Sequence, residues 1–441
     1  MDGSPTEMNG ATGVYRLPFA HGSLTFGLPP GIRAHVAALP VEGPAAALPD
    51  DDAAIAAALA QPLGAPPLRE LARAGQRVCI VVTDATRACP DHRLAPAVIA
   101  ELLSAGVAAD AITILVGLGL HRPSTPEEKR AHLGEAVLRN YHVIDHDLSD
   151  VVALGESASG APLWIAREVA AADLVIATGI VEPHPHAGFS GGAKTVAIGA
   201  GGEPTIAFTH SPAMLDRPGV SIGIVAGNPF QDTVREGGRR ARLRFVVNTV
   251  LNAQKQMVAV AAGDPIAVHD HLWPLARRLS FVVVPQEYDA IIAGVGYPKD
   301  ENLYQATRAA INIVLSPRPA VKQGGMIIVA AAAPEGAGVG LGEGRFRDLM
   351  RRADDPQAII DELRRRPFQA GEQAAYMVAK TMLRAEIVIV GARQPTDVTE
   401  LGLTAAATMA EATALLVERC GPAAEALVIP QGLLTVVEAT A

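Results

Sequence analysis

Short, uninterrupted runs of β-branched and aliphatic residues most limit how this chain can fold. The runs are Val78–Val82, Ile112–Val116, Leu174–Ala177, Asp289–Ala293, Met326–Val329, Ile387–Val390 and Ala426–Ile429. Each is continuous rather than alternating, as expected for a strand covered by helices on both faces of a parallel sheet. Helical patterns separate the runs, for example at 94–103, 304–315 and 371–384. The sequence therefore predicts an α/β fold of two doubly wound, Rossmann-like lobes with a cleft between them.

The spacing of these runs also predicts how the chain divides into domains. We expect an N-terminal domain at 1–268, a helical connector at 269–284 and a C-terminal α/β domain at 285–441, whose last residues pack back on the first lobe. The segment Tyr15–Pro40 has the pattern of an antiparallel hairpin, which we expect to be added to the first lobe.

Composition excludes several classes of protein. Of the 441 residues 49% are hydrophobic and only 19% charged, so the chain has enough apolar surface to fold. A net charge of −9 argues against binding the phosphate backbone of a nucleic acid. Only three cysteines occur, no apolar run reaches the ~20 residues of a membrane span, and Met1–Gly13 lacks the features of a secretory signal. We expect a cytoplasmic protein without membrane or nucleic-acid partners.

Polar residues follow the first two predicted strands. Ligands bind beyond the carboxyl ends of strands in open parallel sheets, so these residues are candidates for a site. The turn Asp84–Arg87 combines an acid, a hydroxyl and a guanidinium before a helix, where an anion would be favoured; a helix cap with a surface arginine is the plain alternative. His121 follows the second strand and is either structural or catalytic.

The segment after the third strand has the richest set of functional groups. Residues 182–194 read EPHPHAGFSGGAK, with two histidines, a Ser-Gly-Gly turn and Lys194 in one loop. Glycines let the backbone approach a ligand closely, although the Walker spacing is absent and a plain turn is the alternative. His210 lies in an apolar stretch, so it is either hydrogen-bonded or a metal ligand. In the second set of strands, Gln305 and Arg308 share one helix face, and Arg308 is either a carboxylate clamp or a solvated side chain.

In this order the motifs resemble those of the nickel-pincer lactate racemase family. The resemblance covers the chain from about Tyr15 to the last strand, and the motifs that support it are DATR at 84–87, GLHRP at 119–123, EPH at 182–184 with AGFSGGAK at 187–194, THSP at 209–212, and YPKD at 297–300 with YQ at 304–305. It implies that domain 1–268 binds the cofactor and catalyses the reaction.

The resemblance also implies roles for single residues. Lys194 matches the lysine that anchors the nickel-pincer nucleotide, a pyridinium-3,5-bisthiocarboxylic acid mononucleotide of Ni(II), and His210 matches the protein ligand of the metal. His121 and His184 match the paired acid/base histidines. The remaining cofactor-binding positions are Asp84, Ala85, Thr86, Arg87, Ser190, Gly191 and Gly192, and the substrate-binding positions are Arg87, Gln305 and Arg308. Separate maturation proteins are the implied partners.

The implied reaction is racemisation or epimerisation of a 2-hydroxy acid by transient hydride transfer. The chemistry suits these residue types, because removal of the α-hydrogen as hydride avoids a carbanion, and an imidazole titrates near working pH. Two alternatives are a pyridine-nucleotide dehydrogenase, disfavoured because no Gly-x-Gly-x-x-Gly turn follows the first strand, and a non-catalytic homologue that binds the cofactor.

Two departures from the family concern the substrate. Arg308 stands where lactate racemases tend to have lysine, and Gln373-Ala374-Ala375 stands near Gly371 where the family often has His-Lys-Ala. A guanidinium keeps the charge but replaces a point donor by a planar fork. A longer or dicarboxylic 2-hydroxy acid is therefore at least as well supported as lactate.

Overall fold

The computed structural model describes residues 13–40, 42–352 and 355–440, and the segment 1–12, on which the expectation about a secretory signal rests, lies outside them. The chain divides into two compact units. The first unit comprises 40–279 with 368–370, and the second comprises 1–39, 280–367 and 371–441. The domain limits expected from the sequence stay a prediction.

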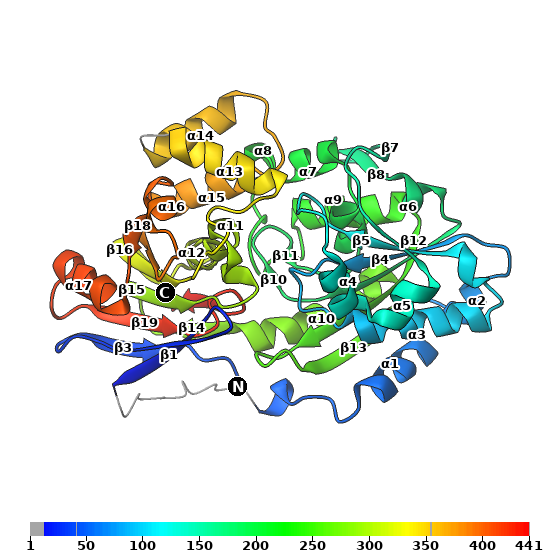
Figure 1. Ribbon diagram of the computed structural model, residues 1–441, viewed down its shortest axis with the longest axis horizontal. Helices are drawn as coiled ribbons and strands as arrows, with labels where there is room; N and C mark the ends of the chain where they lie inside the picture. Colours follow the sequence, from blue (N-terminus) through cyan, green and yellow to red (C-terminus); the bar gives the residue numbers. More distant parts are fainter. Residues whose placement is uncertain (1–12, 41, 353–354, 441) are drawn as a thin grey trace. The chain divides into compact units, whose positions relative to one another are not determined.

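A six-stranded sheet forms the centre of the first unit (Figure 1). Its strands, in spatial order, are β13 (Met257–Gly263), β12 (Leu243–Leu251), β9 (Leu174–Ile180), β4 (Val78–Thr83), β5 (Ile112–Gly117) and β6 (His142–Asp145). The strands expected from the first three apolar runs are confirmed as β4, β5 and β9. The sheet is mixed, because β13 runs antiparallel to β12 while the other neighbours are parallel.

Helices and two small sheets surround this sheet. The helices are α1 (Asp51–Ala60), α2 (Leu68–Leu71), α3 (Asp91–Ser104), α4 (Pro126–Leu133), α5 (Glu135–Asn140), α6 (Arg167–Ala171), α7 (Glu203–Thr209), α8 (Pro212–Leu215), α9 (Pro229–Arg240) and α10 (Pro265–Ser280), with short turns η1 (Gly43–Ala45), η2 (Ala109–Ala111) and η3 (Thr195–Gly199). The small sheets pair β7 (Val151–Glu156) with β8 (Pro162–Ala166), and β10 (Pro183–His184) with β11 (Gly188–Phe189).

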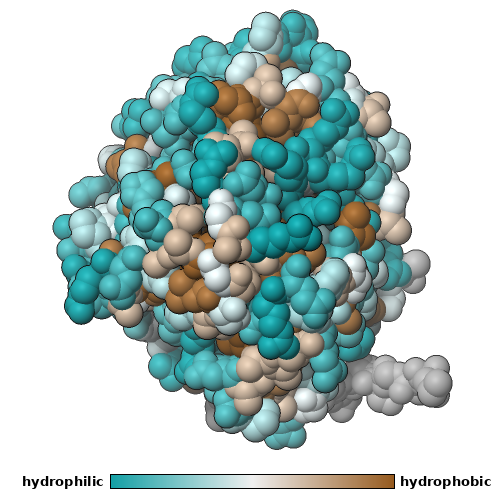
Figure 2. Space-filling view, turned by 90° about the vertical axis from the view of Figure 1, so that its right-hand side faces the viewer, coloured by the Kyte–Doolittle hydropathy of each residue, from teal (hydrophilic) through white to brown (hydrophobic). Residues whose placement is uncertain are grey.

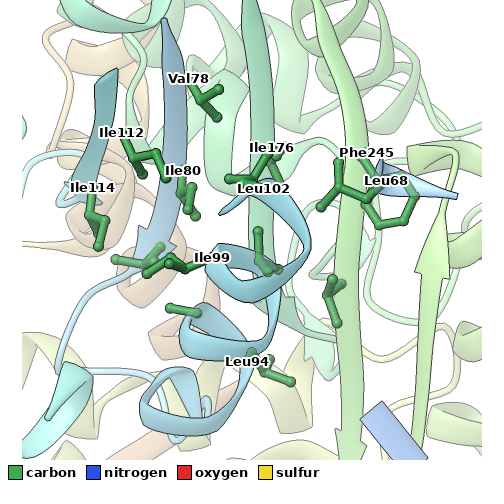
Figure 3. Packing of buried hydrophobic residues seen from close by; sticks show 14 of the residues in the cluster. Leu68, Val78, Ile80, Leu94, Ile99, Leu102, Ile112, Ile114, Ile176 and Phe245 are labelled. Carbon is green, nitrogen blue, oxygen red and sulfur yellow. The ribbon is translucent and has the colours of Figure 1, made fainter. Parts of the chain in front are cut away.

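Helix α3 shows how the sheet is covered. Leu94, Ile99 and Leu102 of α3 belong to the same buried cluster as Ile80 of β4 and Ile176 of β9 (Figure 3). Burying one such side chain stabilises the fold by roughly 1.5–3 kcal/mol, so this interface fixes α3 and the strand ends beside it.

A second six-stranded sheet, parallel throughout, forms the centre of the second unit. Its strands, in spatial order, are β18 (Thr404–Ala406), β17 (Ala385–Val390), β16 (Val321–Ala330), β15 (Tyr288–Gly294), β19 (Glu425–Ile429) and β3 (Arg33–Val36). The last four expected strands are confirmed here. A separate pair joins β14 (Phe281–Val284) to β20 (Val436–Ala439).

The helices of the second unit connect its strands. They are η4 (Lys299–Glu301), α11 (Leu303–Ala306), α12 (Arg308–Val314), α13 (Leu341–Arg352), α14 (Pro356–Arg365), α15 (Gln373–Met382), α16 (Pro395–Thr399) and α17 (Met409–Cys420). The single helix expected over 304–315 is divided at Thr307 into α11 and α12.

The N-terminal hairpin is present but belongs to the other unit from the one expected. Strands β1 (Val14–Phe19) and β2 (Gly22–Gly27) pair antiparallel, and β3 pairs with β19 of the second sheet (Figure 1). Leu17 and Phe26 are buried in the apolar cluster of the second unit, which provides the physical reason for this placement.

The surface of the protein carries both apolar and hydrophilic side chains on the face drawn in Figure 2. On the face drawn in Figure 2, apolar groups are interrupted by hydrophilic ones. Among the described helices, none has both the length and the apolar character needed to span a bilayer.

Candidate active site

The order of the strands determines where the first unit can bind a ligand. The chain leaves β4 toward β5 and β6 on one side, whereas β9 and β12 lie on the other side. The adjacent strands β4 and β9 therefore flank the topological switch point, and ligands in open α/β sheets bind beyond the carboxyl ends there. The loops that follow Thr83 and Ile180 contain most of the residues expected from the sequence.

Asp84 and His121 form a hydrogen-bonded pair at this edge. Nδ1 of His121 contacts Oδ2 of Asp84, while Oδ1 accepts hydrogen bonds from the backbone N–H of Thr86 at 3.1 Å and its hydroxyl at 2.6 Å. Asp84 is 6% exposed. Burial alone would raise the pKa of Asp84, but His121, the charge of Arg87 and the Thr86 hydroxyl outweigh burial and hold it well below its usual range. Asp84 is therefore a carboxylate, and His121 donates to it through Nδ1–H.

An ion pair links the loops that follow β4 and β9. Nη1 of Arg87 lies 3.2 Å from Oε1 of Glu182, and both side chains are mostly buried. Ala85 is half-buried in the same turn as Arg87. The pair holds the guanidinium beside Asp84, where its other N–H groups provide the planar fork that suits a carboxylate.

His184 is held by the hairpin in which it lies. Its Nδ1 accepts hydrogen bonds from the backbone N–H groups of His186 at 3.3 Å and Ala187 at 3.2 Å. Buried Asn228 fixes this turn, because its amide donates to the carbonyl of His186 at 2.8 Å and to that of Ile224 at 2.9 Å. The ring of His184 is therefore oriented by main-chain groups on Nδ1.

The glycine-rich loop before Lys194 has a backbone that only glycine adopts easily. Gly191 and Gly192 have φ of +86° and +56°, and a Cβ on Gly191 would lie 2.6 Å from Val181. Buried Asn248 of β12 accepts a hydrogen bond from the N–H of Gly192 at 2.7 Å. The hydroxyl of Ser190 donates to the carbonyl of Ile180 at 2.7 Å. This loop ends at half-buried Lys194, directly before η3.

His210 is a buried neutral imidazole at the end of α7. Its Nδ1 lies 3.0 Å from the carbonyl oxygen of Ile206, four residues earlier, so Nδ1 carries the proton. Burial, and then the charge of Lys194, lowers the pKa of His210 to about 3. The sequence left open whether His210 is hydrogen-bonded or a metal ligand, and the structure shows the hydrogen bond. It leaves the lone pair on Nε2, which is how metal-binding histidines are commonly oriented.

Aromatic contacts bring the histidines of these loops together. The ring centroid of His186 lies 5.7 Å from that of His184 and 5.6 Å from that of His210. Phe230 of α9 packs against all three rings, at 6.1 Å from His184, 6.0 Å from His186 and 5.0 Å from His210. Over the described residues, no group of three or more His, Cys, Asp or Glu side chains is arranged to hold a metal ion.

A second carboxylate–histidine pair lies at the base of the Asp84 loop. Asp91 is fully buried; it accepts hydrogen bonds from the hydroxyl of Thr83 at 2.8 Å and the thiol of Cys89 at 3.4 Å, and lies 2.8 Å from Nε2 of His132. Burial opposes both charges, but their mutual attraction lowers the pKa of Asp91 and raises the pKa of His132. Together with the hydrogen bond from Thr83, this pair joins the end of β4 to α3 and α4, and so holds together the two ends of the loop that contains Asp84.

Gln305 and Arg308 lie in the second unit, in α11 and at the start of α12. Nη1 of Arg308 donates to Oε1 of Gln305 at 3.2 Å, as their shared helix face predicts. Nearby in the same unit, Nε2 of Gln373 donates to the hydroxyl of Tyr304 at 3.1 Å. The expected substrate role of Gln305 and Arg308 stays a prediction.

Glu182 and His186 lie in the loop that the sequence singled out, but sequence reasoning assigned them no role of their own. Four further residues that build the site were missed: Phe230, Asn248, Asp91 and His132. Two of them left a usable signal. Asn248 interrupts the apolar run 243–251, and a polar residue there needs a buried hydrogen-bond partner. Asp91 is an acid at a helix start, but its pairing with His132 is a contact over 41 residues that no local pattern reveals.

Comparison with known proteins assigns the family. Models of the lactate racemase N-terminal domain and the lactate racemase C-terminal domain match residues 20–223 and 285–437. Lactate racemase of Lactiplantibacillus plantarum is 34% identical over 388 residues, which cover 86% of this chain and 89% of the relative. Lactate racemase of Thermoanaerobacterium thermosaccharolyticum is 27% identical over 387 residues, with the same coverage.

Solved structures agree with this assignment. The lactate racemase apoprotein from Thermoanaerobacterium thermosaccharolyticum matches with a TM-score of 0.81 and 26% identity, over 96% of this chain and 99% of that one. A Thermotoga maritima protein at 17% identity and a TM-score of 0.68, over 89% of this chain and 99% of that one, shows a similar fold only. Two domain models in the expected order and a relative at 34% identity place this chain in the lactate racemase family, a family of isomerases.

Proposed function

We propose that this protein racemises or epimerises a 2-hydroxy carboxylic acid, with a nickel-pincer nucleotide held covalently by Lys194. One observation supports this most: His121, which follows β5, is hydrogen-bonded to the carboxylate of Asp84, and Arg87, in the same turn as Asp84 after β4, is paired with Glu182. The imidazole of His121 suits the removal of a hydroxyl proton, and the guanidinium of Arg87 suits the binding of a carboxylate. A 2-hydroxy acid has both groups on adjacent carbons.

The residues of the first unit fit the proposed cofactor. His210 has a protonated Nδ1 and a lone pair on Nε2, so it suits Ni(II) as the one ligand supplied by the protein, beside soft donors of the cofactor. Gly191 and Gly192, both with positive φ, form the turn directly before Lys194, so the backbone of this loop takes a conformation that residues with a side chain adopt rarely. Asp84, Ala85, Thr86 and Ser190 are the other proposed contacts. When bound, the group would supply an acceptor for the α-hydrogen as hydride.

The chain's own residues would bind the substrate and move its proton. Arg87 would hold the carboxylate, oriented by Glu182. His121 and His184 are the proposed acid/base pair for the hydroxyl proton, and Asp84 would stabilise the charge that His121 gains. Removing the hydroxyl proton makes departure of the α-hydrogen as hydride favourable, because a planar keto acid results. Return of hydride to the opposite face would give the other enantiomer.

Arg308 and Gln305 are the proposed determinants of substrate choice. Their hydrogen bond fixes a planar fork of donors where related racemases tend to have a lysine. A fork binds two oxygens of a second carboxylate better than a single ammonium does. We therefore propose a longer or dicarboxylic 2-hydroxy acid as substrate alongside lactate.

The proposal includes the setting in which the protein works. Cofactor-maturation proteins are its proposed partners, and the cytoplasm its proposed location. The three cysteines are free thiols, two of them buried, which agrees with a reducing compartment.

Covalent attachment gives the first test. The wild type and a Lys194→Ala variant would be produced with nickel and the maturation proteins, with Lys322→Ala as control because that lysine pairs with Asp289 of the second unit. Intact mass should show the adduct on the wild type and on Lys322→Ala, and none on Lys194→Ala. An adduct that persists on Lys194→Ala would remove this lysine from its role.

A further inference from the structure

A buried asparagine interrupts strand β12 next to the glycine-rich loop. The side chain of Asn248 is 0% exposed, and its neighbours Val246 and Val247 in the strand are buried as well. Burying an amide side chain is unfavourable unless its polar atoms are hydrogen-bonded, so the contacts of this amide indicate its role. Strand β12 pairs with β9, the strand that leads into the loop of Lys194.

The oxygen of Asn248 holds the turn that ends at Lys194. Oδ1 accepts the hydrogen bond from the backbone N–H of Gly192 at 2.7 Å. A backbone N–H only donates, so this contact determines which end of the amide faces the turn. Within the turn, the N–H of Lys194 donates to the carbonyl of Gly191 at 3.1 Å. Gly192 is therefore held from outside the turn by β12, and Lys194 is bonded to Gly191 inside it.

Gly179 leaves the space that the side chain of Asn248 occupies. It is the register partner of Asn248 in β9, and its φ is not positive, so its backbone does not require glycine. A Cβ at Gly179 would lie 3.1 Å from Nδ2 of Asn248 and 3.2 Å from Oγ1 of Thr195. Thr195 directly follows Lys194, and its hydroxyl donates to the carbonyl of Thr178 at 3.2 Å. The sheet thus holds the backbone on both sides of Lys194, through Asn248 before it and through Thr178 after it.

The two ends of the Asn248 amide are not equivalent. Nδ2 is buried and has no hydrogen-bond partner among the residues that the structure describes, so this end of the amide is desolvated without compensation. An apolar residue at this position would take the acceptor from the N–H of Gly192, whereas no bond to Nδ2 would be lost. The oxygen is therefore the end that the fold uses, and its contact is with the turn of Lys194.

We infer that Asn248 is a positioning residue, which holds the Gly191–Gly192 turn so that Lys194 presents its amine to the cofactor. This inference rests on the proposed function and adds no bond to it, because Asn248 acts only through the backbone of Gly192. Two adjacent glycines give a turn great conformational freedom, and a lysine that follows such a turn would sample many positions. A hydrogen bond from an interior strand removes much of that freedom before the amine reacts.

Three variants separate the oxygen of Asn248 from the size and burial of its side chain. Asn248→Leu keeps a similar size but removes the acceptor. Asn248→Asp keeps an oxygen toward Gly192 and changes only Nδ2, which has no partner among the described residues. Asn252→Leu is the matched control. Asn252 is also buried, in the turn after β12, where its Oδ1 accepts from the N–H groups of Gln254 and Gln256, each at 3.0 Å.

The rate of covalent loading is the first readout. Each variant would be produced with nickel and the maturation proteins, and the fraction of protein that carries the adduct would be followed over time by intact mass. We expect Asn248→Leu to load about tenfold more slowly than the wild type, and Asn248→Asp at least about threefold faster than Asn248→Leu. Asn252→Leu should load within about twofold of the wild type. Asn248→Leu that loads as fast as the wild type, or Asn248→Asp that loads no faster than Asn248→Leu, would overturn the inference.

Hydrogen–deuterium exchange of the protein without cofactor is the second readout. By mass spectrometry, the segment 190–195 should exchange about tenfold faster in Asn248→Leu than in the wild type, and at the wild-type rate in Asn248→Asp and Asn252→Leu. In Asn252→Leu the segment 252–257 should exchange faster instead. If Asn248→Leu does not fold, Gly179→Ala takes its place, because its methyl group would lie against Nδ2 and displace the amide from the turn. Unchanged exchange of 190–195 in the folded variant would contradict the inference.

The two readouts distinguish this inference from the proposed function. If the wild type forms no adduct while the exchange of 190–195 depends on Asn248, the role of Asn248 in holding the turn stands and the proposed attachment at Lys194 fails. If the wild type forms the adduct and Asn248→Leu forms it equally fast, the proposed attachment stands and the inference fails.

Discussion

Replacing Asp84 by asparagine changes one oxygen to an NH₂ group and reverses the tautomer of His121. The N–H and the hydroxyl of Thr86 both donate to Oδ1 of Asp84. In the variant the oxygen of the asparagine therefore keeps accepting from Thr86, and its NH₂ group faces Nδ1 of His121. The ring must then accept on Nδ1, and its proton moves to Nε2, where the base is needed. A charge-assisted hydrogen bond contributes about 1.5–3 kcal/mol, and with about 1.4 kcal/mol per tenfold we expect kcat/KM to fall about 10- to 150-fold.

The structure offers a matched control for this substitution. Asp147 makes the same local turn as Asp84, with Oδ1 accepting from the N–H of Ser149 at 2.8 Å and from its hydroxyl at 2.7 Å, but it is exposed. Asp147→Asn should keep full activity. The assay is loss of optical purity of the substrate by chiral chromatography, with cofactor loading equalised by intact mass. An Asp84→Asn variant within about twofold of the wild type, or an equal loss in both variants, would refute the reasoning.

Two further predictions concern stability and substrate choice. Asp91→Asn should lower the free energy of unfolding by about 3 kcal/mol, most strongly between about pH 4 and 6.5. The pKa of Asp91 is lowered in the folded protein, so its contribution to stability is present above its unfolded pKa. The pKa of His132 is raised, so its contribution is lost as the pH rises through its folded pKa. Urea unfolding at about pH 5.5 and about pH 8.5 checks this, and an equal difference at both pH values would contradict it. Arg308→Lys removes the fork that donates to Gln305 and should change the ranking of 2-hydroxy acids by kcat/KM; an unchanged ranking would exclude Arg308 from substrate choice.

The strands of both sheets were predictable because their signal is local. A run such as Ile112–Val116 is apolar on both faces, and burial between two layers of helices is the reason for it. Strand β3 and its hairpin were placed on the wrong lobe, because β3 pairs with β19 about 390 residues away in sequence. Only 4 residues long and partly exposed, β3 shows no pattern that names its partner.

Much of the candidate site follows from the motifs, but its protonation does not. The position of His121 and His184 after strand ends is visible in the sequence, and both lie where those strands end. Whether Nδ1 donates or accepts depends on what faces the ring, which is Asp84 in one case and the backbone of Ala187 in the other. Backbone N–H groups leave no trace in a sequence, so this asymmetry requires the fold.

The most direct test of the proposed reaction is a racemisation screen of the loaded protein. Both enantiomers of a panel of 2-hydroxy acids, lactate and longer or dicarboxylic members included, would be incubated with protein whose adduct is confirmed by intact mass. We expect one acid to reach the same mixture of enantiomers from either side, with no net formation of keto acid. A loaded protein that leaves every acid optically pure, or that only oxidises one of them, would contradict the proposed function.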